Sequence, residues 1–244
     1  MSGAVLILGG RSDIGLAIAR AYAAEGHAIQ LAARPGRSME PERADIALRH
    51  GVEVTLHDFD VLTTDDHEGF VDSLPELPDI VVCAVGLMHD QEEMEQDLTK
   101  AHEVMRANFE GPANILSVLA NRFEARGRGT LIGISSVAGD RGRATNYFYG
   151  AAKAGFTAFL SGLRNRLAQK GVHVLTVKPG FVATQMTAGM DLPEKLTADP
   201  DNLAQAVLRA AKRGRNTVYI KPVWWLVMLI IRNIPEPVFK KLRI

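Results

Sequence analysis

The sequence has a single cysteine and no excess of charge of either sign. Cys83 stands alone in a chain of 244 residues, so an intramolecular disulfide and a cysteine-based zinc site are both excluded. Its neighbours Val81, Val82 and Ala84 are apolar, which indicates a buried strand residue and not a reactive thiol. The 28 basic residues equal the 28 acidic ones. This balance argues against a nucleic-acid partner, because such a binding surface needs an excess of Lys and Arg.

The chain also lacks a hydrophobic run long enough to cross a membrane. Its most apolar stretch, residues 222–231, is shorter than the roughly 20 apolar residues that a spanning helix needs. The stretch contains two tryptophans, and four basic residues follow it: Arg232, Lys240, Lys241 and Arg243. Such a pattern is typical of an element in a membrane interface, and it predicts peripheral contact through Val223 to Ile231. A core helix, a cover over an active site and an oligomer contact are the alternatives.

A basic leader segment is absent, since the N-terminus enters a strand-like run at once. We therefore expect a cytoplasmic protein, peripheral at the inner membrane face if the tail binds lipid. With 47% apolar and 23% charged residues, the composition is typical of a soluble globular protein. The length suits one domain, residues 1–244, in which 222–244 form an apolar and basic extension. We also expect a homo-oligomer.

Strand-like and helical patterns alternate along the whole chain. The predicted strands are 4–8, 28–33, 52–56, 79–84, 130–134, 172–177 and 217–220. The predicted helices are 13–26, 41–50, 66–74, 98–126, 146–169 and 201–212, and the segment 87–96 is expected to be a loop or a short helix. Gly111 and Pro112 fall inside the long helix, where a proline should cause a kink. The alternation predicts a doubly wound, mostly parallel α/β sheet of the Rossmann type.

A glycine-rich turn follows the first predicted strand. Gly9 permits a tight turn and Gly15 permits close packing, while Ser12 or Asp13 could cap the helix that begins there. A strand, a glycine turn and a helix together offer backbone N–H groups and a positive helix end to phosphate groups. A plain strand-to-helix turn is the competing interpretation.

The second predicted strand is followed by arginine instead of an acidic residue. No Asp or Glu occurs between His27 and Met39, and Arg34 occupies the position at which an acidic residue would bind the ribose of NAD. Arg34, with Arg11 in the glycine turn and Arg37 nearby, could clamp the 2′-phosphate of NADP. The sequence therefore favours NADP(H) over NAD(H), whereas the alternative is that these are solvated loop arginines.

Tyr149 and Lys153 are four residues apart and share one face of a predicted helix. A phenol has a pKa of roughly 10, and a nearby ammonium lowers this value. Such a tyrosine can act as a general acid or base toward a carbonyl or an alcohol. Ser136 ends the preceding strand, where its hydroxyl could hold the same oxygen. The alternative is a chance Tyr-x-x-x-Lys pattern, but the neighbouring strand-end motifs favour the catalytic interpretation.

These motifs resemble those of the classical short-chain dehydrogenase/reductase family, from the Gly9 turn through Thr184. The resemblance implies hydride transfer between a nicotinamide and a carbonyl or alcohol, and it implies a catalytic set of Ser136, Tyr149, Lys153 and Asn108. It implies cofactor contacts from Gly9, Arg11, Ser12, Asp13, Ile14, Gly15, Arg34, Asp60, Gly86, Tyr149, Lys153, Pro179, Gly180, Val182 and Thr184. It implies no metal, and no His, Cys or carboxylate cluster in the sequence has ligand spacing.

The chain departs from the family pattern in its cofactor loops. Asp13 replaces the usual middle glycine, Leu8 the usual leading threonine, and residues 83–86 read Cys-Ala-Val-Gly where Asn-Asn-Ala-Gly is common. The glycine turn, the segment 135–155 and the tail 219–244 are similar to the branch of decaprenylphosphoryl-2-keto-pentose reductases. That similarity implies a lipid-linked keto sugar as substrate. A soluble ketone, alcohol or acyl substrate is the alternative, and a non-catalytic dinucleotide sensor is an alternative from another class.

Overall fold

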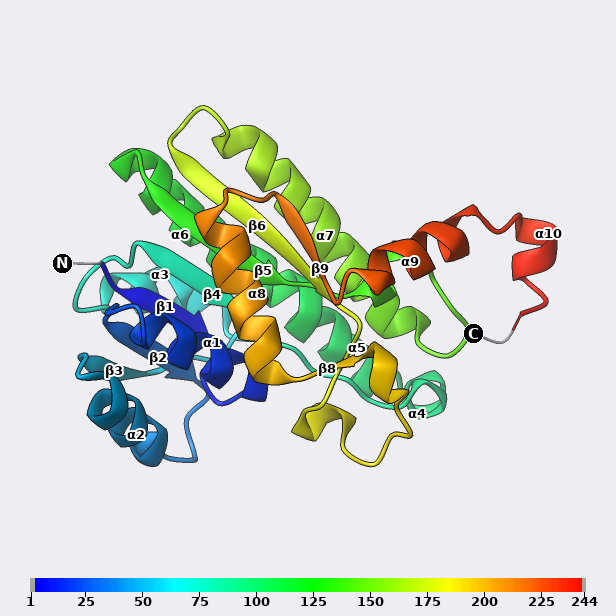
Figure 1. Ribbon diagram of the computed structural model, residues 1–244, viewed down its shortest axis with the longest axis horizontal. Helices are drawn as coiled ribbons and strands as arrows, with labels where there is room; N and C mark the ends of the chain where they lie inside the picture. Colours follow the sequence, from blue (N-terminus) through cyan, green and yellow to red (C-terminus); the bar gives the residue numbers. More distant parts are fainter. Residues whose placement is uncertain (1–2, 243–244) are drawn as a thin grey trace.

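A parallel sheet forms the centre of the molecule. In this computed structural model, residues 3–242 are described, and they contain a seven-stranded sheet of order β3-β2-β1-β4-β5-β6-β9 whose neighbouring strands are all parallel. The strands are β1 (Val5–Leu8), β2 (Ile29–Ala33), β3 (Val54–Asp58), β4 (Ile80–Cys83), β5 (Gly129–Ile134), β6 (Val172–Pro179) and β9 (Thr217–Ile220). The predicted fold class is confirmed (Figure 1).

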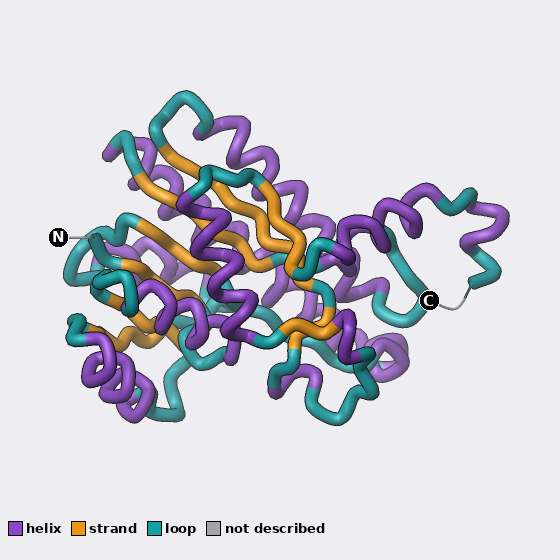
Figure 2. Tube along the Cα trace, viewed as in Figure 1, coloured by secondary structure: helices purple, strands orange, loops and turns teal. Residues whose placement is uncertain are grey.

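Helices cover both faces of the sheet, as Figures 1 and 2 show. The main helices are α1 (Asp13–Ala23), α2 (Glu40–His50), α3 (His67–Asp72), α6 (Gly111–Arg126), α7 (Tyr147–Leu167) and α8 (Pro200–Lys212). In β1, Val5 and Ile7 pack with α1, α2 and α8, whereas Leu6 and Leu8 pack with α3, α6 and α7. This alternation follows from the two-residue period of a strand, and it divides the core into two layers.

The predicted helix 98–126 is not one regular helix. It begins as α5 (Leu98–Met105), continues as a π-helical segment (Arg106–Glu110), and ends as α6. Pro112 lies in the first turn of α6, directly after the π segment. The expected proline kink is therefore replaced by a π segment just before the proline, and segments of this kind are frequent at functional sites.

Short elements connect the layers at the carboxyl end of the sheet. They comprise α4 (Gln91–Gln96), the small sheet of β7 (Phe181–Val182) with β8 (Thr197–Ala198), and the 3₁₀ turns Thr64–Asp66, Val137–Asp140, Gln185–Thr187 and Glu194–Leu196. After β9, the chain forms α9 (Val223–Asn233) and α10 (Glu236–Phe239), which project from the body of the molecule in Figure 1. Within residues 3–242, no helix combines the length and the apolar character that crossing a membrane would require.

Candidate active site

Ser136, Tyr149 and Lys153 come together at the carboxyl end of the sheet. Ser136 follows β5 and caps a 3₁₀ turn, accepting a hydrogen bond from Ala138 N at 3.1 Å. Tyr149 and Lys153 lie in the first turns of α7, and the Tyr149 hydroxyl is hydrogen-bonded to the Ser136 side chain. Lys153 Nζ lies 5.7 Å from the centroid of the Tyr149 ring. A hydroxyl, a phenol and an amine thus share one corner of the fold.

Lys153 is held at the end of β5 and is withdrawn from solvent. Its Nζ donates a hydrogen bond to Ile134 O at 3.1 Å, and the residue is only 3% exposed. Burial disfavours the ammonium form and lowers the pKa of Lys153 to about 8. The amine therefore changes its charge close to neutral pH.

The pKa of Tyr149 is raised, whereas the sequence led us to expect that Lys153 would lower it. Burial raises the pKa of Tyr149 to about 12, and the hydrogen bond from Ser136 opposes this rise without cancelling it. Desolvation outweighs this hydrogen bond, because burial removes the charged phenolate from water. The phenol is consequently neutral, and so is set to donate a proton, over the usual pH range.

Asn108 lies beside this trio in the π-helical segment. It is fully buried, and its Nδ2 donates to Leu87 O at 2.6 Å and to Val104 O at 2.9 Å. Gly86 lies against it, since a Cβ at that glycine would be 3.3 Å from Asn108 Oδ1 and 3.8 Å from Lys153 Nζ. The end of β4, the π segment and α7 therefore meet at one point.

A cavity of about 200 Å³ begins beside Gly86 and extends across the ends of β1, β2 and β3. Six of the predicted cofactor residues line it: Gly9, Arg11, Ser12, Arg34, Asp60 and Gly86. Gly9 has φ +90°, and a Cβ there would lie 2.9 Å from the backbone of Ala84. Only glycine fits this close turn without strain. Ser12 caps α1 by accepting from Gly15 N at 3.0 Å, so the N-terminus of α1 opens next to this cavity.

The three arginines predicted to bind phosphate differ in their contacts and in whether they line this cavity. Arg11 Nη1 donates to Arg34 O at 2.6 Å, and its buried Nε has no hydrogen-bond partner in the part of the chain that the structure describes. Arg34 is exposed at the end of β2. Arg37 instead lies 3.9 Å from Glu42 and does not line the cavity. The Arg11 Nε and the exposed Arg34 side chain, beside a glycine turn, fit a phosphate-bearing ligand.

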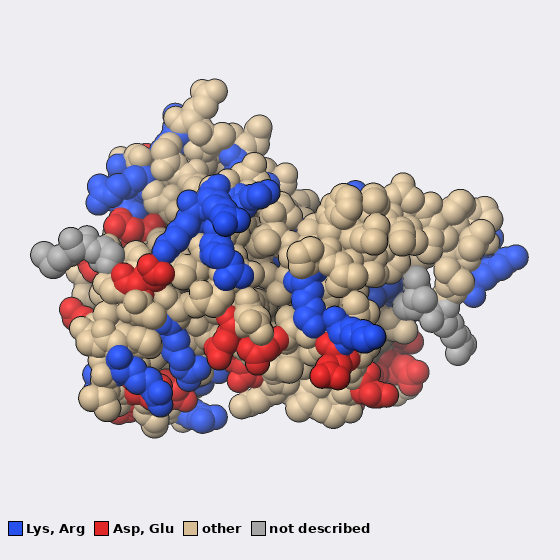
Figure 3. Space-filling model, viewed as in Figure 1, with Lys and Arg blue, Asp and Glu red and all other residues tan. Residues whose placement is uncertain are grey.

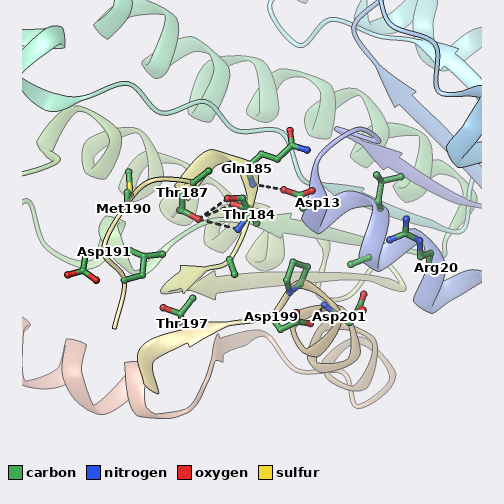
Figure 4. A pocket seen from close by; sticks show the side chains of 16 residues that line it. Asp13, Arg20, Thr184, Gln185, Thr187, Met190, Asp191, Thr197, Asp199 and Asp201 are labelled. Carbon is green, nitrogen blue, oxygen red and sulfur yellow. Dashed lines mark hydrogen bonds between the residues drawn. The ribbon is translucent and has the colours of Figure 1, made fainter. Parts of the chain in front are cut away.

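Asp13 and Thr184, also predicted to contact the cofactor, lie in a second hollow of about 880 Å³ between α1 and the segment 183–201. Figure 4 shows Asp13 pointing at Gln185, whose backbone N–H donates to Asp13 Oδ2 at 2.7 Å. The Thr184 backbone N–H donates a hydrogen bond to Thr187 Oγ1 at 3.2 Å. The carboxylate that replaces the usual glycine therefore fastens the loop after β6 to the start of α1.

The remaining predicted cofactor residues have structural contacts. Ile14 packs against the core, and a Cβ on Gly15 would meet Gly9 O at 2.5 Å. Val182 is buried in β7. Pro179 O faces Ser136 Oγ at 3.5 Å, and a Cβ on Gly180 would lie 2.0 Å from the Trp224 ring. Pro179 and Gly180 therefore lie next to the trio, whereas Ile14, Gly15 and Val182 support the loops from within.

Sequence reasoning missed the polar residues that join the loop between Ser136 and Tyr149 to β9 and the C-terminal helices. Asp140 forms a buried ion pair with Lys178 and accepts a hydrogen bond from the Tyr219 hydroxyl at 2.8 Å. Burial and the Asp140 carboxylate raise the pKa of Tyr219 to about 12. Arg141 contacts the C-terminal helices. Only the position of Asp140 and Arg141, directly between Ser136 and Tyr149, could have drawn attention to them.

Cys83 is fully buried in β4, as predicted, and burial raises the pKa of its thiol to about 11. Among the residues that the structure describes, no three His, Cys, Asp or Glu side chains are grouped so as to hold a metal ion.

A family model described as short chain dehydrogenase matches residues 3–195. The chain belongs to the short-chain dehydrogenase/reductase family. An uncharacterised oxidoreductase of Mycobacterium tuberculosis is 35% identical over 241 residues, covering 98% of this chain and 96% of the relative. The acetoacetyl-CoA reductase of Allochromatium vinosum is 29% identical over 221 residues, covering 85% and 90%. The resemblance stated from the motifs is thus confirmed for this oxidoreductase family.

A solved short-chain dehydrogenase from Sphingobium yanoikuyae, in complex with NADPH, has the same fold. It superposes with a TM-score of 0.81 at 24% identity and covers 96% of each chain. At this level of identity the likeness supports the fold of this short-chain dehydrogenase/reductase and nothing finer.

Proposed function

We propose that this short-chain dehydrogenase/reductase is an NADP(H)-dependent carbonyl reductase. The observation that carries the proposal is the meeting of Ser136, Tyr149 and Lys153 beside a glycine-lined cavity that two arginines border. A nicotinamide dinucleotide fits this arrangement, with Gly9 giving close backbone approach and the α1 N-terminus facing phosphate. When bound, the nicotinamide supplies the hydride that reduces the carbonyl carbon.

The side chains of the trio complete the reaction. The Ser136 hydroxyl donates a hydrogen bond to the carbonyl oxygen, so the growing negative charge meets a fixed dipole. The Tyr149 hydroxyl then gives its proton to that oxygen, leaving a phenolate. The Lys153 ammonium, held against Ile134 O, stabilises this phenolate. Asn108 keeps the loop after β4 in place through its hydrogen bonds with the backbone of Leu87. A neutral, buried Tyr149 with a raised pKa suits this reductive direction.

NADP(H) is preferred to NAD(H) in this proposal. Arg34 stands exposed after β2, and Arg11 lies against its backbone, so both can pair with a 2′-phosphate.

The proposed substrate is a carbonyl compound, and a lipid-linked keto sugar is the leading candidate. The tail resemblance supports it, and so does the apolar helix α9, which packs against Val137 and Phe181 next to the trio. A soluble ketone or acyl substrate is the second candidate, favoured by the 29% identity to an acetoacetyl-CoA reductase. A panel of carbonyl substrates, including a polyprenyl-phosphate keto pentose, with NADPH and with NADH distinguishes them.

Replacing Tyr149 by phenylalanine tests the chemistry directly. Tyr149→Phe removes the proton donor and keeps the ring, so NADPH should bind normally while turnover falls by about 10²-fold or more. NADPH fluorescence titration measures binding and NADPH oxidation measures turnover. Near-normal turnover in the variant would contradict the proposed role. Binding without turnover in the wild-type protein, across the whole panel, would favour the dinucleotide sensor.

We also propose that the protein is a homo-oligomer, which light scattering of the purified chain would check, and that it is cytoplasmic, which cell fractionation would check.

A further inference from the structure

The helices α9 and α10, residues 223–239, form what we call the C-terminal arm. Its inner face is firmly seated on the catalytic end of the sheet. Trp224 and Met228 are buried against Val137, the residue after Ser136, and the Trp224 ring meets the Phe181 ring edge-on at 5.4 Å. Trp224 Nε1 donates to Leu196 O at 2.9 Å. The arm is therefore continuous with the walls of the active site.

Arg141 fastens the outer half of the arm. Its Nη1 donates to Ile231 O and Ile234 O, each at 2.7 Å, and its Nη2 lies 2.8 Å from Glu236 Oε2. The guanidinium carbon also lies 3.5 Å from the centroid of the Phe239 ring. Arg141, in the loop between Ser136 and Tyr149, thus bonds to the C-terminal carbonyls of α9 and holds α10. The body of the enzyme therefore fixes the direction in which the arm projects.

The opposite face of α9 is apolar and open to solvent. Trp225, Leu226, Leu229 and Ile230 follow the i, i+1, i+4, i+5 spacing of one helix face, and Trp225 and Ile230 are 56% and 59% exposed. Val238 on α10 is also exposed. Figure 3 shows the arm as a largely uncharged surface with basic atoms at its outer end. Such a continuous apolar face marks an interaction site.

The charges around this face select the partner. Lys240 and Lys241 are exposed directly after the arm, and the one acidic residue in the arm, Glu236, already pairs with Arg141. Two copies meeting through this face about a two-fold axis would bring these like charges together, which opposes a symmetric dimer contact. An anionic surface instead meets both the apolar face and the basic residues.

We propose that the C-terminal arm docks on the surface of an anionic lipid membrane. Trp225, Leu226, Leu229 and Ile230 enter the interface, and Lys240 and Lys241 pair with lipid phosphates. Since Trp224 and Arg141 tie the arm to the Ser136 loop, docking holds the active site next to the bilayer surface. The proposal of lipid binding is based on the arm alone. The further statement that docking helps the enzyme to reach a lipid-carried substrate rests on the proposed function.

Vesicle sedimentation of the full chain tests the apolar face. Wild-type protein should sediment with vesicles of phosphatidylcholine and phosphatidylglycerol, and the double substitution Leu229→Glu/Ile230→Glu should weaken binding at least about tenfold, because it removes buried apolar area and adds negative charge. Leu48→Glu is the matched control, since Leu48 is 88% exposed on α2, away from the arm, and it should bind as the wild type does. Equal binding by all three proteins would overturn the proposal.

The basic residues are tested separately. Lys240→Gln/Lys241→Gln should reduce binding to anionic vesicles by about 30-fold at low salt, and binding to pure phosphatidylcholine should be weak for every variant. If Leu229→Glu/Ile230→Glu instead dissociates an oligomer in size-exclusion chromatography, and the wild type binds no vesicles, the face is a subunit contact and the proposal is wrong. Sedimentation needs no substrate, so vesicle binding without carbonyl reduction would refute only the proposed function.

Discussion

At the scale of single residues, burial shifts the pKa values of Lys153 and Tyr149 in opposite directions. It lowers the pKa of the amine to about 8 and raises that of the phenol to about 12, because in each case the charged form is disfavoured. Near neutral pH the pair is therefore an ammonium beside a neutral phenol. This is the combination required for donating a proton and then stabilising the phenolate that remains.

The pH dependence of carbonyl reduction should follow Lys153. As the pH rises through about 8, the ammonium is lost while Tyr149 stays protonated, so the rate should fall on the alkaline side. Folding stability should rise with pH between this pKa and the ordinary lysine value of roughly 10.4, because the unfolded chain then binds more protons. Stopped-flow measurements of the reduction rate from about pH 6 to 10, a range that includes the pKa of Lys153, check the predicted fall at alkaline pH. Lys153→Arg keeps its charge, so its alkaline limb should move upward; an unchanged limb would assign it to another group.

Arg34 should set the choice between the two nicotinamide cofactors. Arg34→Gln removes a charge-assisted contact with the 2′-phosphate, which should raise the KM for NADPH by about 10-fold to 100-fold and leave that for NADH nearly unchanged. Arg37→Gln is the matched control, because Arg37 is close to Glu42 and lies outside the cavity. Equal effects of both substitutions on NADPH would mean that only general positive charge matters.

At the scale of elements, the start of α6 depends on a glycine that packs against a wall of the cavity beside Gly86. A Cβ on Gly111 would lie 2.2 Å from Val61 O, and Val61 lines the cavity. Gly111→Ala should therefore destabilise the protein by about 1–3 kcal/mol, the usual effect of overpacking. Denaturant unfolding followed by circular dichroism measures this change.

Gly162→Ala is the control for this substitution. Gly162 lies inside α7, where a Cβ would meet nothing within 4 Å. Alanine is the better helix former there and should stabilise the protein by roughly 0.5–1 kcal/mol. A destabilisation at both glycines would show that helix context, and not the approach of Val61, governs the response.

The elements show where sequence reasoning succeeds and where it stops. The strands and helices were predictable because hydrophobic periodicity is local, and the Tyr149–Lys153 pair was predictable because four residues define one helix face. The π segment around Asn108 was not, since its Asn108 side chain bonds to Leu87, 21 residues away in the chain. The raised pKa of Tyr149 also escaped prediction, because desolvation depends on every layer around the site.

At the scale of the whole molecule, the feature that the sequence predicted least well is how the C-terminal arm packs on the rest of the protein. Arg141 and Ile231 are 90 residues apart, and nothing in their local sequence indicates a contact. The sequence left four interpretations of the tail open. Its inner face is now seen to pack beside Val137, and its outer face is exposed, so one helix serves as a wall of the site on one side and as an open surface on the other.

The single thiol, in the central strand β4, is a natural probe of global unfolding in this protein. Cys83 is fully buried between β1 and β5. A thiol reagent can reach it only when the sheet separates, so the labelling rate should track the free energy of unfolding across variants. Mass spectrometry of the alkylated chain would follow it without any introduced probe. Labelling faster than the free energy of global unfolding allows would mean that the sheet opens locally between β4 and its neighbours.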